Sequence, residues 1–235
     1  MLDFVDTIFT AAAGAVLLIV ICTIPQSRAW RLASAAILGA WTGLAIAIAA
    51  SGGLANSAVV GILAAVPLVT VAVLAASSAP VRSALLAVPL PLIIGVNVFR
   101  VLGAGFLVLA SVGRLGGPFP LSAGWGDIIT GLLAIPVALL ATRVPASDLR
   151  IVAWNTFGAL DLVCAIALGI TSANGSPLQL IHAGAGSAAM GALPWSLVPT
   201  VLVPLYLIGH GIVFARVRAA SATYRVAPHA TAWER

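Results

Sequence analysis

Long apolar stretches alternate with short polar connections along the whole chain, and their lengths predict helices that cross a membrane. A helix needs about 20 apolar residues to span the hydrocarbon core. Seven stretches reach or approach this length, which predicts an all-α fold, a polytopic bundle of seven transmembrane helices. The predicted spans cover residues 5–24, 32–50, 58–76, 91–113, 126–141, 151–170 and 196–215. We expect one seven-helix domain over residues 1–218 and a short cytoplasmic tail over residues 219–235.

Two of the connections carry features of their own. Residues 83–90 form an extra apolar segment before the fourth span, and Pro89 and Pro91 predict a break in the helix there. The connection 171–195 is expected to form either a short re-entrant or surface helix around residues 177–181 or a mobile loop. Neither connection predicts a soluble domain.

The composition places the protein in a lipid bilayer. Hydrophobic residues make up 62% of the chain, charged residues only 7%, and the mean hydropathy is +1.17. Soluble domains carry about 25% charged residues. The formal net charge of +5 comes from arginines scattered among short connections, so we expect no nucleic-acid partner. All 11 basic residues are arginine, and the absence of lysine excludes a chromophore bound through a lysine Schiff base.

The arginines are unevenly divided between the two sides of the predicted bundle. Arginine-rich short connections stay in the cytoplasm. One side carries Asp3, Asp6 and only Arg114. This asymmetry predicts that the N-terminus lies outside and the C-terminus inside. The arginines of the predicted inner side are Arg28, Arg31, Arg82, Arg143, Arg150, Arg216, Arg218 and Arg225.

Arg100 lies within the fourth span, in a run that has no other charge from residue 91 to 113. A charge near the bilayer centre costs at least ~2.5–3.5 kcal/mol and requires a partner. At 1.5 Å per residue, Arg100 lies roughly 14 Å, and Asp161 of the sixth span roughly 15 Å, from the inner ends of their helices. Asn155 and His210 fall one or two turns nearer the inner side. The matched depths predict an ion pair between Arg100 and Asp161.

Asp127 follows Gly124-Trp125-Gly126 at the predicted start of the fifth span, near the outer end and apart from Arg100. An acid in the first turn complements the positive end of a helix. The other interpretation assigns Asp127 to an external vestibule. We therefore expect Asp127 either to stabilise the helix start or to contribute to a binding site at the outer end.

Two interpretations of the inner polar set remain open. In the functional one, Arg100 supplies positive charge to a bound solute, ion or proton, and Asp161 is its counter-ion or the proton acceptor. Asn155 and His210 then supply hydrogen bonds along the approach. In the structural one, the ion pair fixes how two helices pack, and His210 bonds to a backbone carbonyl. Ionisable groups inside a membrane are functional by default, which favours the first interpretation.

Glycines on both sides of His210 leave room for a haem, with the imidazole as axial ligand, or for a closely packed helix. A bis-histidine haem needs a second histidine in the membrane, whereas His182 falls in a connection and His229 in the tail. Close helix packing is therefore the favoured interpretation, and the identity of any cofactor stays open.

The chain carries no paired-histidine metal motif, no nucleophile elbow and no phosphate-binding glycine loop. The acids near the spans are also too few to resemble a carboxylate-rich metal centre. These absences favour a protein that is not an enzyme, with no catalytic residues and no metal ligands.

The polar residues and the glycines around them form a pattern of short motifs along the chain. Its parts are Arg100-x-x-Gly103-x-x-Phe106-Leu107, Gly124-x-Gly126-Asp127, Asn155-x-x-Gly158-x-x-Asp161, Pro204 and His210. In this pattern, over about residues 91–218, the chain resembles an uncharacterised group of bacterial multi-pass inner-membrane proteins. The resemblance implies the bacterial inner membrane and a shared polar set, and no activity is established for the group.

Three functions fit seven short-looped helices. The leading one is binding or translocation of a small solute or ion at a polar site between spans four, six and seven. The site residues would be Arg100, Asn155, Asp161 and His210, with Asp127 at the outer end. A haem- or quinone-binding redox protein would instead show a visible absorption band. A non-catalytic subunit or assembly partner would co-purify with another membrane protein.

Overall fold

The computed structural model describes residues 2–23 and 27–226, and every regular element in these residues is helical. Among them, seven helical segments are long and apolar enough to cross a membrane, which confirms the predicted number. The end of the first predicted span, Ile24, and residues 227–235 of the predicted tail lie outside the described residues. The seven segments are Leu2–Cys22, Arg28–Ala50, Ser57–Ser77, Leu90–Ser111, Phe119–Leu140, Leu149–Thr171 and Val198–Ala220.

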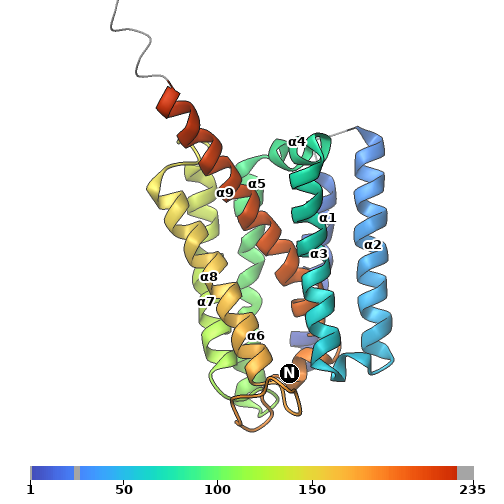
Figure 1. Ribbon diagram of the computed structural model, residues 1–235. Coiled ribbons are helices and arrows are strands. Elements are labelled where there is room, and N and C mark those ends of the chain that lie inside the picture. The colour runs from blue at the N-terminus through green and yellow to red at the C-terminus, as the bar shows by residue number, and fades with distance from the viewer. Residues whose placement is uncertain (1, 24–26, 227–235) are drawn as a thin grey trace, which may run out of the picture.

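The helices follow one another up and down through the bundle (Figure 1). In chain order they are α1 (Leu2–Thr23), α2 (Arg28–Ala50), η1 (Gly53–Ala55), α3 (Ser57–Ser77), α4 (Ala79–Ala87), α5 (Leu90–Gly95), η2 (Val96–Gly103), α6 (Ala104–Ser111), α7 (Phe119–Leu140), α8 (Leu149–Thr171), η3 (Ala188–Gly191), η4 (Val198–Leu202) and α9 (Val203–Val226).

The centre of the bundle is formed by the last four spans. α7 packs against α5, η2, α6 and α8, and α8 packs against α9. Burial distinguishes the central spans from the outer ones. In Leu90–Ser111, 44% of the most apolar stretch is buried, but in Arg28–Ala50 and Ser57–Ser77 only 6% is buried. Figure 1 shows α1, α2 and α3 on one side, α7 and α8 on the other, and α9 running obliquely between them. The first three spans therefore offer most of their surface to lipid.

The fourth span is not the regular helix that its apolar run predicts. α5 gives way after Gly95 to η2, a 3₁₀ helix of eight residues, which is followed by α6. Runs of this type longer than three or four residues are uncommon, and they place residues i and i+3 on the same line. The buried residues of η2 are spaced in this way, at Asn97, Arg100 and Gly103. The 3₁₀ geometry thus turns all three toward the interior.

The fifth span begins earlier than predicted. α7 starts at Phe119, with Pro120 in its first turn, where a missing N–H leaves no internal bond unmade. The predicted start, Gly126, therefore lies two turns inside the helix. The seventh span also differs, since α9 continues to Val226 and includes the first residues of the predicted tail.

The two distinctive connections have clear structures. α4 is a separate short helix that ends at Ala87, which confirms the break predicted at the following prolines. Arg216 of α9 donates hydrogen bonds to the carbonyl oxygens of Leu86 and Val88 at this break. Residues 177 and 178 form a turn and residues 179–181 have no regular structure, so the helical alternative for this connection is wrong, and the short helix η3 lies further along.

A proline in span seven provides an anchor for α2. Pro204 has no N–H, so it leaves the carbonyl of Thr200 without its usual helical partner. The indole Nε1 of Trp41 donates to this oxygen at 2.9 Å. The bond ties the peripheral helix α2 to the π-helical turn η4 at the start of span seven.

Apart from Arg100 and Arg114, the arginines of the described residues lie at or near the helix ends on the side of the bundle where α9 ends. We predict that this end faces the cytoplasm. In a variant without Cys22 and Cys164, a cysteine at Asn174 should react with an impermeant maleimide added to intact cells. A cysteine at Ser147 should react only after the cells are opened. The reverse pattern would show that the orientation is inverted.

Candidate functional site

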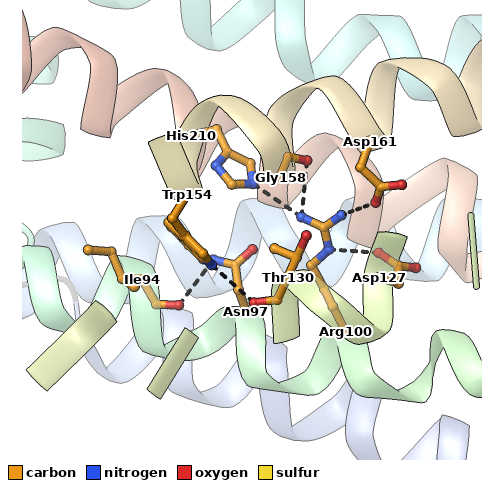
Figure 2. Close-up of polar contacts among 9 residues, drawn as sticks. All are labelled: Ile94, Asn97, Arg100, Asp127, Thr130, Trp154, Gly158, Asp161 and His210. Atoms are coloured by element: carbon orange, nitrogen blue, oxygen red, sulfur yellow. Dashed lines mark hydrogen bonds and ion pairs between the residues drawn. The ribbon is translucent and has the colours of Figure 1, made fainter. Parts of the chain in front are cut away.

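The guanidinium of Arg100 is the centre of a polar cluster inside the four central spans (Figure 2). Its side chain is only 1% exposed. The Nε atom donates to Asp127 Oδ1 at 2.7 Å, and Nη2 donates to Asp161 Oδ2 at 2.5 Å. Nη1 donates to the carbonyl oxygen of Gly158 at 3.2 Å. One arginine of η2 thus binds two carboxyl groups, one from α7 and one from α8.

His210 of α9 completes the ring of acceptors around Arg100. Its Nε2 atom lies 3.2 Å from Arg100 Nη1. Arginine can only donate, so Nε2 accepts, and the proton of the neutral imidazole is assigned to Nδ1. Nδ1 lies 2.8 Å from Asn155 Oδ1 and donates to it, while Asn155 Nδ2 donates to the His210 carbonyl at 3.2 Å. The bond from the His210 ring to a backbone carbonyl, which the structural interpretation included, is therefore wrong.

The structure brings together all five residues that the sequence analysis selected, including the one expected to lie apart. Asp127 was placed in the first turn of the fifth span. α7 begins at Phe119, so Asp127 lies eight residues inside the helix, roughly 12 Å from its start. This depth is the reason why Asp127 reaches Arg100 instead of stabilising a helix end.

Glycines allow the helices to approach closely enough for these contacts. A Cβ at Gly103 would lie 2.4 Å from Asp127 Cβ, and one at Gly126 would lie 1.7 Å from Asp161 Oδ1. A Cβ at Gly158 would lie 2.8 Å from His210 Cε1. Each of these polar side chains therefore rests against a glycine of a neighbouring helix.

A second group of buried polar residues lies beside the cluster, toward the arginine-rich end. Trp154 donates to the Thr130 carbonyl at 3.1 Å, and its ring lies 5.5 Å from that of His210. Asn97 donates to the carbonyls of two residues in the preceding turn (Figure 2). Among the described residues, Asn97 Oδ1 and Thr130 Oγ1 have no hydrogen-bond partner. Sequence reasoning missed both, although an asparagine three residues before Arg100 was a visible signal.

With both of its carboxyls ionised, the cluster carries one uncompensated negative charge. One guanidinium and two ionised carboxyls give +1 − 2 = −1. His210 adds nothing, because its Nε2 accepts from arginine and the ring is neutral. Within the described residues no other cationic side chain pairs with Asp127 or Asp161. The ring of Tyr206, 5.8 Å from Arg100 Cζ, stabilises the guanidinium and adds no charge.

The arrangement also bears on cofactors. Both ring nitrogens of His210 are engaged, so axial ligation of a haem would require breaking a bond to Arg100 or to Asn155. In the described part of the chain, no three His, Cys, Asp or Glu side chains gather as metal ligands.

The charge balance gives a prediction about stability. Arg100→Gln leaves two buried carboxyls without a cation and should cost about 3–5 kcal/mol. Asp127→Asn or Asp161→Asn each leave one balanced pair and should cost clearly less. Thermal unfolding in detergent would compare them, with Arg150→Gln as control, because Arg150 belongs to an exposed pair. An Arg100→Gln variant as stable as this control would contradict the charge balance.

The glycine contacts give a second prediction. Gly126→Ala forces its methyl group into Asp161 and should destabilise the protein by about 1–3 kcal/mol. Gly43→Ala is the matched control, because nothing lies within 4 Å of the Cβ it would add. Melting temperatures in detergent would separate the two. Equal melting temperatures would show that the helices at Asp161 can move apart without loss.

A family model described as a domain of unknown function, DUF8737, matches residues 57–218, which include every member of the polar cluster. Neither a curated protein nor a solved structure matches the chain. The matched segment covers four of the seven membrane-length helices completely, from Ser57–Ser77 to Leu149–Thr171, and all but the last two residues of Val198–Ala220. The chain therefore belongs to the DUF8737 family.

Proposed function

We propose that this protein, in a bacterial inner membrane, binds and exchanges one small cation, a proton or a monovalent metal ion, at the Arg100 cluster. The observation that carries the proposal is the sharing of one guanidinium by Asp127 and Asp161. A charge left alone in hydrocarbon is costly, so a net charge of −1 favours an additional cation at the carboxyls.

The ratio of two carboxyls to one guanidinium distinguishes this proposal from a purely structural role. An ion pair that only fixes helix packing needs one acid for one base. Here the second carboxyl adds a desolvation cost that packing alone does not require. The carboxyl oxygens that do not bond to Arg100, Asp127 Oδ2 and Asp161 Oδ1, supply the ligands for the additional cation.

The exposure of the side chains supports entry of the cation at Asp127. The exposed fraction rises from 1% at Arg100 to 7% at Asp161 and 15% at Asp127. Asp127 also lines a cavity at the predicted outer half of the bundle. A cation would therefore reach the cluster from the predicted outer side at Asp127, while Arg100 stays in place.

Polar groups continue from the cluster toward the arginine-rich end. Asn155 bonds to His210, and the unpartnered Asn97 Oδ1 and Thr130 Oγ1 lie in the same region. Buried polar atoms of this kind are satisfied by water or by a passing ion. Their position supports translocation through the cluster rather than binding from one side only.

Infrared spectroscopy of the purified protein tests the proposal. We expect the carbonyl stretch of a protonated carboxyl near neutral pH, lost in Asp127→Asn or in Asp161→Asn. Asp148→Asn is the matched control and should keep the band, because Asp148 lies outside the spans and pairs with the exposed Arg150.

A metal ion in place of the proton gives a different signature. The band would then be absent, and the melting temperature would rise with sodium or potassium because the ion binds only the folded state. Either Asp→Asn variant should abolish this rise. Absence of both the band and the ion dependence would overturn the proposal.

A further inference from the structure

A cavity of about 840 Å³ lies beside the Arg100 cluster, in the half of the bundle that holds the N-terminus. α3 and the second half of α8 contribute opposite walls, and α6 and α7 contribute to the same enclosure. The segments around η1 and η3 line the end away from the cluster. The volume falls in the range of about 300–1,000 Å³ that is typical of sites for small organic ligands.

The walls are apolar apart from a few groups. On α3 and α8 the lining includes small residues such as Gly61, Ala64, Ala165 and Gly169, which create the space. Among the described lining residues, Asp127 is the one charged side chain. An apolar enclosure with one charged group at its end fits a ligand with an apolar body and a single charged head.

The charge of the site selects the sign of that head. Asp127 belongs to a cluster in which two carboxyls share one guanidinium, and its partner Arg100 is only 1% exposed. A cationic head at Asp127 neutralises the excess charge. An anionic head would meet repulsion from both carboxyls without reaching the guanidinium.

The cavity wall also contains two aromatic rings. Phe106 and Phe119 both line the cavity, and their ring centroids lie 5.9 Å apart. Phe106 follows Gly103, the residue that packs against Asp127, by three positions. Aromatic faces attract organic cations, most strongly where water is excluded.

We propose that this cavity binds a lipophilic organic cation whose positive group lies against Asp127. This inference rests on the proposed function, because the charged head of the ligand would occupy the proposed cation site at Asp127. Binding then replaces the small ion at Asp127, so that the two cations compete for one carboxyl.

Equilibrium binding of tetraphenylphosphonium to the full chain in phosphatidylcholine nanodiscs tests the proposal. The wild type should bind this cation, and tetraphenylborate, with the same shape and opposite charge, should not compete. Asp127→Asn should weaken binding at least about tenfold, the loss expected for one charge-assisted contact. Ala165→Phe should weaken it by a similar factor by filling the cavity.

Ala167→Phe is the matched control. Ala167 lies two residues further along α8, is exposed and does not line the cavity, so binding should be unchanged. Equal binding of the two probes, or binding that Asp127→Asn and Ala165→Phe leave intact, would overturn the proposal, because the probes would then partition into the bilayer without a site at Asp127.

The carboxyl measurements keep the two proposals distinguishable. Ala165→Phe should weaken probe binding about tenfold while the infrared band or the ion dependence persists, because Ala165 makes none of the hydrogen bonds to Arg100. A wild-type protein that keeps the carboxyl signature but binds no tetraphenylphosphonium would overturn the ligand proposal and leave the small-cation site standing.

Discussion

The burial of the Arg100 charge is the constraint on which the packing of the central spans depends. The guanidinium makes four hydrogen bonds, to acceptors on α7, α8 and α9. Because its donors point in fixed directions in one plane, these acceptors must meet around that plane. The outer spans α1, α2 and α3 have no comparable requirement, and they remain largely exposed to lipid.

The same constraint explains the local irregularities. Neighbouring helices approach closely at Gly103, Gly126 and Gly158, where any larger side chain would occupy the position of Asp127, Asp161 or His210. The 3₁₀ geometry of η2 aligns its buried residues with this narrow space. Small residues and irregular backbone therefore occur where the polar side chains need room, as is common in membrane helices that hold buried polar groups.

Several parts of the site could be predicted from the sequence. Matched depths predicted that Arg100 lies level with Asp161, because a rise of 1.5 Å per residue holds well in the regular helix α8. Asp127 was misplaced because apolarity alone set the helix start at Gly126, whereas the turn at Phe119 begins the helix seven residues earlier. The 3₁₀ segment and the cavity could not be predicted, because both arise from contacts between helices and leave no mark in local composition.

η2 also links the length of the fourth span to the direction in which the Arg100 side chain points. A 3₁₀ helix rises about 2.0 Å per residue and an α-helix 1.5 Å, so conversion of its eight residues would shorten the span by about 4 Å. The same conversion would turn Arg100 by about 60° relative to Asn97. The length of the span and the direction of the Arg100 side chain would therefore change together. A displacement at either end of η2 would alter the contacts of Arg100 with both carboxyls.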